Sequence, residues 1–147
     1  MKSMWESEVR EEVLARTRKL QPTAPARWGK MNCSRMLTHV TDGLRMATGE
    51  LYVAPKTTPL KFTPIKQLII YWLPFPKGAP TAPELIERTP GEWDREVAQF
   101  KDALQNFAAN SEKADWPEHP AFGKLTTKDW GVLVYRHIDH HFRQFGA

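Results

Sequence analysis

Three of the five histidines in this chain lie within five consecutive positions, in the stretch YRHIDHHFRQF at residues 135–145. His137 and His141 are four residues apart, so on a helix their side chains lie on one face, one turn apart. His140 directly precedes His141 and therefore points elsewhere on the same helix. Two imidazoles at this spacing can bind a metal ion, although such a pair also arises by chance. The stretch predicts two candidate ligands and one bystander.

A third histidine, His39, falls on the apolar stripe of another predicted helix, where Gly43 leaves room beside it. Three neutral imidazoles suit Zn, Ni, Fe or Cu. A centre with three protein ligands keeps one position open for water or substrate, as catalytic zinc sites do. We therefore predict a metal site formed by His39, His137 and His141. The alternative is three core histidines, each with its own hydrogen-bond partner.

Ile138 occupies the position that glutamate would have in an H-E-x-x-H motif, so metalloprotease chemistry is not expected.

Four further residues are candidates for the surroundings of the metal. Asp42 and Gln144 could each hold a ligand histidine in one tautomer. The alternatives are a solvent-exposed carboxylate for Asp42 and a helix-end cap for Gln144. His119, in the stretch WPEHPAFG, is either a surface-loop residue or part of the mouth of the metal pocket, because its loop leads into the ligand helix. His140 is a neighbour of the site rather than a ligand.

The composition is that of one soluble globular domain spanning residues 1–147, with 41% hydrophobic and 26% charged residues. The net charge is +4, but the basic residues are scattered among 17 acids, so we expect no nucleic-acid partner. A single cysteine, Cys33, excludes an internal disulfide and fits a reducing cytoplasm. The N-terminal residues lack the apolar core of a signal peptide, and no apolar run reaches the length of a membrane span. We expect a cytoplasmic protein.

Two helices are predicted in the N-terminal part of the chain. The first opens at Ser3, with Glu6 three residues later as a capping box, and ends before Pro22. The second follows Asn32, a favourable N-cap, and ends near Gly49. This second helix carries His39.

Two more helices are predicted in the C-terminal part. In one, Thr89 caps the helix, Pro90 takes the first helical position and Glu92 completes the capping box. The other starts with a Thr126 cap and Asp129 three residues later, and it carries the paired histidines. No segment shows the sustained alternation of a strand, so we predict an all-α fold.

The connection at residues 49–88 is too long for a simple helical hairpin and holds seven of the twelve prolines. Long connections of this kind inside compact domains are often functional. We expect a short helix at residues 65–73, followed by a proline-rich coil. A crossing of this length allows the third long helix to run parallel to the second.

Three stretches of the chain resemble the DinB superfamily, in particular its branch of uncharacterised bacterial domains. They are RWGKMNCSRMLTHVTDGL at 27–44, PKGAPTAPEL at 76–85 and HPAFGKLTTKDWGVLVYRHIDHHFRQF at 119–145. The final H-x-x-H-H-x-x-Q motif is the most specific of them. Arg143 replaces the glycine that usually precedes the glutamine in this family, which concerns the packing of the helix end rather than the ligands.

The resemblance implies a four-helix bundle with up-down-down-up topology and a long proline-rich crossover between the second and third helices. It also implies a divalent metal, commonly zinc or nickel, held by His39, His137 and His141. His140 is usually present in the family but is not a ligand.

The characterised members of the superfamily that this chain resembles include transferases and isomerases that use bacillithiol, mycothiol or glutathione. In these proteins the metal activates a low-molecular-weight thiol as a thiolate. The resemblance therefore favours a metal-dependent thiol transferase acting on a small-molecule substrate. The alternatives are a metal-dependent hydrolase using metal-bound water, or a non-enzymatic metal- or small-molecule-binding module, acting as a homodimer through exposed helix faces.

Overall fold

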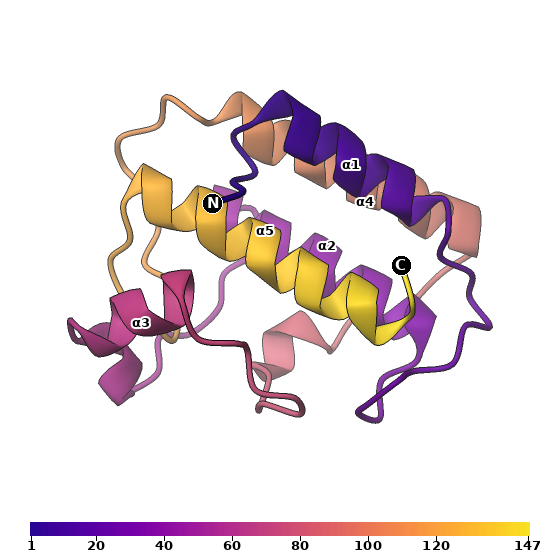
Figure 1. Cartoon of the computed structure of the whole chain (residues 1–147), viewed down its shortest axis with the longest axis horizontal. Coiled ribbons are helices and arrows are strands. Elements are labelled where there is room, and N and C mark those ends of the chain that lie inside the picture. Colours follow the sequence, from indigo (N-terminus) through magenta and orange to yellow (C-terminus); the bar gives the residue numbers. More distant parts are fainter.

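Five α-helices and two short 3-10 helices form the fold, and no strand is present. The computed structural model describes residues 1–147 (Figure 1). The prediction of an all-helical chain is confirmed. None of the helices has the combination of length and apolar character that crossing a bilayer requires. The helices are α1 (Ser7–Thr17), α2 (Cys33–Thr48), α3 (Ile65–Tyr71), α4 (Trp93–Ala109) and α5 (Thr127–Gln144), with η1 (Pro59–Lys61) and η2 (Pro83–Leu85).

Helices α2 and α4 pack against each other and run in the same direction. Arg45 in α2 donates a hydrogen bond to Gln99 Oε1 in α4 over 3.0 Å. Further along both helices, Asn106 in α4 donates to the carboxylate of Glu50, just past the end of α2. Parallel neighbours need a connection that returns to the starting end, and the long segment between α2 and α4 makes this return.

Helices α1 and α5 run opposite to α2 and α4, as Figure 1 shows. Ahead of α1, the Met4 amide donates to the Gly131 carbonyl near the start of α5 over 2.9 Å. Near the end of α1, Arg16 donates to Asp139 in the second half of α5 over 2.7 Å. The two helices therefore advance together, and α5 lies antiparallel to α2.

The caps of α2 and α5 agree with the predictions. Asn32 is the N-cap of α2, where its side chain accepts a hydrogen bond from the Arg35 amide. Gly49 ends that helix in the left-handed conformation, with φ of 87°, which favours glycine. Thr126 and Asp129 form a complete capping box at the start of α5. Both histidine-bearing helices, α2 and α5, thus begin where local side chains satisfy their first amides.

The first helix begins later than predicted, at Ser7, with Glu6 as its N-cap. The Ser3 amide does donate to Glu6 Oε1 over 2.8 Å, but residues 4–5 form a turn instead of helix. The reason is that these residues bond to α5 instead. The Trp5 indole donates to the Thr127 carbonyl over 2.7 Å, in addition to the Met4 contact.

The third long helix, α4, also begins later than predicted, at Trp93, and Thr89 does not cap it. Glu96 explains the shift. Its buried carboxylate accepts a hydrogen bond from the Gly91 amide over 2.9 Å and pairs with Arg88 over 2.9 Å. These contacts turn the chain around the Glu96 side chain, and the helix starts only after that turn.

The predicted short helix in the crossover is confirmed as α3, at Ile65–Tyr71. Arg136 of α5 holds it by donating to the carbonyls of Ile69 and Ile70, each over 2.6 Å. Lys66 donates to the Lys124 carbonyl over 2.8 Å, just before α5. The crossover is therefore an ordered layer on α5, at the level of the histidine pair.

The close approach of the N-terminal turn to α5 depends on Gly131. A Cβ atom at this position would lie 2.3 Å from Trp5 Nε1 and 2.4 Å from Ser3 Oγ. We predict that Gly131→Ala lowers the free energy of unfolding by about 1–3 kcal/mol, because the turn must move to relieve the overlap. Urea unfolding followed by circular dichroism measures this change.

Gly43→Ala is the matched control, since its Cβ would find its nearest neighbour, His137 Cε1, at 3.6 Å. This is an ordinary contact, so helix propensity dominates, and the variant should be unchanged or more stable by up to about 1 kcal/mol. Equal stability of the Gly131→Ala variant and the unmodified protein would contradict the packing described for the N-terminal turn.

Candidate metal centre

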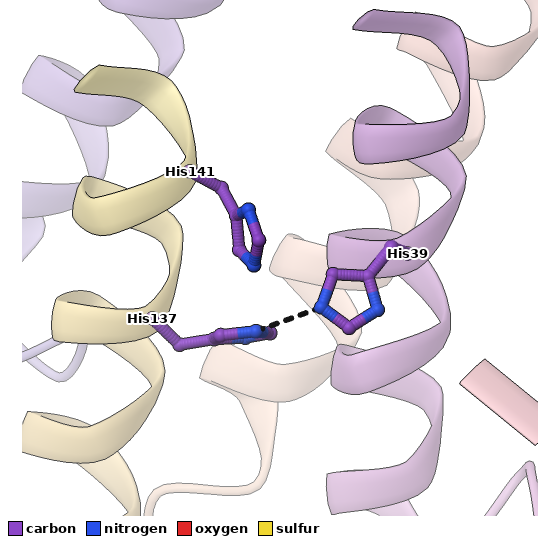
Figure 2. Close-up of side chains that lie close together, drawn as sticks. All are labelled: His39, His137 and His141. Atoms are coloured by element: carbon purple, nitrogen blue, oxygen red, sulfur yellow. Dashed lines mark hydrogen bonds between the residues drawn. The ribbon is translucent and has the colours of Figure 1, made fainter. Parts of the chain in front are cut away.

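Three imidazoles from two helices converge on one point, as Figure 2 shows. His39 extends from α2, and His137 and His141 extend from α5. The Nε2 atoms of His39 and His137 are 2.9 Å apart, and one nitrogen from each of the three rings lies within 4.8 Å of the others. The structure thus brings together all three residues of the predicted metal site. No cysteine or carboxylate belongs to this group.

The tautomer of His39 follows from a contact with the crossover. His39 Nδ1 lies 3.1 Å from the Leu85 carbonyl in η2, and a carbonyl can only accept. Nδ1 therefore carries the proton, and Nε2 presents a lone pair to the other two histidines. In the hydrogen bond between the two Nε2 atoms, His137 must then be the donor.

The tautomer of His141 is set by Gln144, one turn later on α5. His141 Nδ1 lies 2.9 Å from Gln144 Oε1, and Gln144 Nε2 donates to the Trp28 carbonyl over 2.8 Å. The second contact orients the amide, so its oxygen faces the imidazole and His141 Nε2 is left free. Gly29 permits this approach, because its φ is 77° and a Cβ there would lie 3.0 Å from Gln144 Nε2. Partners of this kind tune and orient metal-binding histidines.

Gly43 makes room for His137 of α5, rather than for His39 on its own helix as predicted. The Cβ position of Gly43 lies 3.6 Å from Cε1 and 3.7 Å from Nδ1 of the His137 ring. The reason is the antiparallel packing of α2 on α5, which places the two residues opposite each other. An alanine Cβ would fit here in ordinary contact, whereas a side chain larger than alanine would press on the His137 ring.

All three cluster histidines are neutral near pH 7. Burial lowers the pKa of His39, against the opposing effects of the Leu85 carbonyl and the Asp42 charge. Burial and the neighbouring imidazoles hold the pKa of His137 well below its usual value. Burial, together with His39, lowers the pKa of His141 to about 3. Neutral imidazole is the form that binds a metal, so protons compete little at physiological pH.

The cluster lies in the wall of a cavity of about 910 Å³, which all five histidines of the chain line. Most of its wall is apolar and comes from α2, α3, α5 and the crossover. Lys30 and Lys56 are its other ionisable side chains, and no aspartate or glutamate reaches it. The volume is ordinary for a small-molecule site.

His119 lines this cavity, which agrees with the predicted alternative that it belongs to the pocket rather than to a surface loop. Its Nδ1 accepts hydrogen bonds from the amides of Ala121 (3.1 Å) and Phe122 (3.2 Å). Nδ1 is therefore unprotonated, and the neutral ring carries its proton on Nε2. Burial lowers the pKa of His119 to about 4, and its ring packs against Trp130 at 5.5 Å between centroids.

Asp42 does not contact any histidine ring, and it is not solvent-exposed either. Its buried carboxylate accepts from Arg45 over 3.1 Å and from Arg88 Nε over 3.1 Å. Arginines compete better than a neutral imidazole for a buried carboxylate, because the pair neutralises its charge. His140 lies on the cavity wall near Trp28, with ring centroids 5.4 Å apart, and is outside the metal-binding group.

Two contributors to the site escaped the sequence analysis. The Leu85 carbonyl sets the His39 tautomer, but a backbone oxygen leaves no signal in residue type. Arg88 lies three residues further on and bridges Asp42 and Glu96. The sequence holds one weak signal for Arg88. It is an arginine at the end of a proline-rich segment, and two predicted helices carry acids that could pair with it.

His119 generates a pH prediction for the metal-free protein. Its pKa is about 4 in the folded chain against 6.5 as the ordinary value, so the unfolded chain binds more protons between these values. Stability therefore falls as the pH drops from 6.5 towards 4, by at most about 1.4 kcal/mol per pH unit from this group. Urea unfolding at a series of pH values between 7 and 4.5 measures the slope.

His119→Asn should make this slope shallower, since an asparagine oxygen can still accept from the two loop amides but does not titrate. The other four histidines, whose pKa values are also lowered, keep their contribution to the slope. His119→Ala should reduce the slope equally and also lose about 1–3 kcal/mol at pH 7, because the amides lose their acceptor. Identical pH slopes for the unmodified protein and His119→Asn would contradict the lowered pKa of the His119 imidazole.

Comparison with known proteins yields one family. Nothing matches among curated proteins or among solved structures. The sequence model of the family described as "Protein of unknown function (DUF1569)" matches residues 6–147, which is nearly the whole chain. The match includes α2 and α5 and therefore the three converging histidines. The chain belongs to the DUF1569 family.

Proposed function

We propose that the protein binds a divalent metal ion, zinc or nickel, through His39, His137 and His141, and that it is a metal-dependent enzyme of the thiol-transferase type. The observation that carries the metal site is the pair of fixed tautomers. His39 Nδ1 donates to the Leu85 carbonyl and His141 Nδ1 donates to Gln144, so both rings direct a free Nε2 towards His137. Isolated core histidines have no need for this convergence.

The spacing of the nitrogens fits an ion of this size. Zinc–nitrogen bonds of about 2.0–2.1 Å at tetrahedral angles separate pairs of ligand atoms by roughly 3.3 Å. The Nε2 atoms of His39 and His137 are 2.9 Å apart, and one nitrogen from each of the three rings lies within 4.8 Å of the others. Small rotations of the rings would bring the three atoms to bonding distance of one ion, once the proton of His137 has moved from Nε2 to Nδ1.

The chain supplies three ligands and no fourth, which supports a catalytic rather than a structural role. Cys33 is buried outside the group, and burial raises the pKa of its thiol to about 11, so it is a poor candidate for a thiolate ligand. A small molecule can therefore occupy the open position.

Thiol chemistry is favoured over hydrolysis by the absence of a carboxylate from the cavity wall. A bound divalent ion stabilises the thiolate form of a low-molecular-weight thiol at neutral pH, without a general base. Hydrolysis is commonly assisted by a glutamate or aspartate that takes the proton from the attacking water. Here the side chains bind and enclose the reactants, and the apolar wall excludes water. A hydrolase and a non-enzymatic binding module, acting as a homodimer, are the alternatives.

The helix directions support the further proposal that α1, α2, α4 and α5 form an up-down-down-up bundle of the DinB type. In such a bundle the second and third long helices are parallel, and a long crossover joins them. The parallel pair α2 and α4, with residues 49–92 between them, has this form. We place the protein in the cytoplasm, where a free thiol such as Cys33 stays reduced.

Metal content tests the first proposal. Protein purified without a polyhistidine tag should hold about one zinc or nickel per chain by elemental analysis, the ratio expected for a single three-ligand site. His39→Ala, His137→Ala and His141→Ala should each lose it, because two imidazoles bind weakly. Gln144→Leu should lower the affinity about 10–100-fold by releasing the His141 tautomer.

His140→Ala is the control for this series, because it removes an adjacent imidazole that lies outside the group. It should keep full metal content. Full retention of metal in both His137→Ala and His141→Ala would exclude the proposed centre.

Thiol binding tests the reaction class. Cobalt-substituted protein titrated with 2-mercaptoethanol should develop an intense sulfur-to-cobalt absorption band, because the open position accepts a thiolate. Ethylene glycol, which replaces the thiol with a hydroxyl, should not produce the band. An unchanged spectrum at millimolar thiol would rule out the transferase proposal and leave hydrolysis or simple binding.

A further inference from the structure

The cavity at the candidate metal centre contains no acidic side chain, although the chain has 17 aspartates and glutamates. The buried acids lie elsewhere and have their own partners. Asp42 pairs with Arg45 and Arg88, and Glu96 pairs with Arg88. Asp129 caps α5 and accepts a hydrogen bond from Tyr71. None of these carboxylates is available to balance a positive charge in the cavity.

A divalent ion held by three neutral imidazoles would keep its full double positive charge. An unbalanced charge in an apolar enclosure is strongly unfavourable, so an anion in the open position would be stabilised. The basic rim acts in the same direction. Lys30 and Lys56 are exposed side chains that line the cavity, and the Lys77 ammonium lies 4.6 Å from the ring centroid of Trp28 on the wall.

The remainder of the wall offers few hydrogen-bond partners to a ligand. Gln144 is committed to His141 and Trp28. The main neutral polar groups of the other lining residues are those of Thr81, His119 and His140, together with the indole N–H groups of Trp28 and Trp130, which have no hydrogen-bond partner. Most of the other lining side chains are aliphatic or aromatic, among them Leu44, Ile69, Leu73, Phe75 and Val134. A highly polar molecule would lose its hydration here without replacement.

We infer that the cavity binds an amphipathic organic anion, with a carboxylate or thiolate head at the three-histidine centre and an apolar body against the wall formed by α2, α3 and α5. This inference rests on the proposed metal site and specifies its ligand class. The apolar wall then recognises the body of the substrate. The absence of acidic side chains from the cavity selects for an anionic head group. Neutral and cationic molecules of the same shape are disfavoured.

Calorimetric titration of the zinc-loaded full chain with a matched set of probes tests the inference. Hexanoate should bind at least about tenfold more tightly than acetate, because its additional methylenes are buried. Hexan-1-ol and hexylamine, with the same body but a neutral or cationic head, should each bind at least about tenfold more weakly than hexanoate. Hexane-1-thiol distinguishes the head groups. If it binds more tightly than hexanoate, thiolate is the preferred head group, and if it binds more weakly, carboxylate is preferred. In both cases the preferred anion must bind more tightly than hexan-1-ol.

Thr81 offers a matched pair of variants, because it lines the cavity and is only half-buried in the crossover. Thr81→Asp places a carboxylate in the wall and should weaken hexanoate binding about tenfold or more. Thr81→Asn, which has the size of aspartate without its charge, should weaken it clearly less. Equal affinity for hexanoate and hexylamine, or for hexanoate and acetate, in zinc-loaded protein would overturn the inference. Zinc content is measured on the same sample. Failure of the chain to take up zinc would instead overturn the metal centre, and the ligand class with it.

Discussion

The hydrogen bond from His39 Nδ1 to the Leu85 carbonyl is the contact on which the rest of the site depends. It joins a helix to the far end of the crossover and determines which nitrogen of His39 faces the other histidines. Its geometry requires that η2 be held against α2. Arg88, three residues after Leu85, does this by pairing with Asp42 of α2 and Glu96 of α4. Both carboxylates are buried, so these pairs contribute more to the location of the crossover than to net stability.

The crossover therefore has two connected roles. It links two parallel helices, which no short turn can do, since α2 alone is about 24 Å long at 1.5 Å per residue. It also supplies one wall of the cavity through α3 and the proline-rich segment that follows. Arg136 of α5 and the Arg88 pairs hold the two ends of this segment. The three-histidine cluster and the enclosure around it thus arise from the same topological requirement.

The acidic side chains of the core lie outside the cavity, whereas the cavity itself holds neutral histidines. The buried acids serve as helix caps and arginine partners, and the histidines stay neutral because burial lowers their pKa values. The result is a pocket with free nitrogen lone pairs, a basic rim and no internal anion. Three neutral imidazoles in such a pocket could hold a metal ion without adding a negative charge to balance it.

The sequence by itself determined the features that depend on residues within about four positions of each other. The Asn32 and Thr126 caps, the Gly49 terminus and the common face of His137 and His141 all follow from such local spacing. The shared helix faces also predicted that His39 would meet the histidine pair, but tertiary structure alone decided which atoms of distant residues are in contact. His39 and His137 are 98 positions apart, and His39 and Leu85 are 46 apart. The late start of α4, the arginine partners of Asp42 and the placement of all five histidines on one cavity depend on long-range packing as well. Helix spacing encodes which side chains share a face, but the approach of that face to another helix is set by the packing of the whole core.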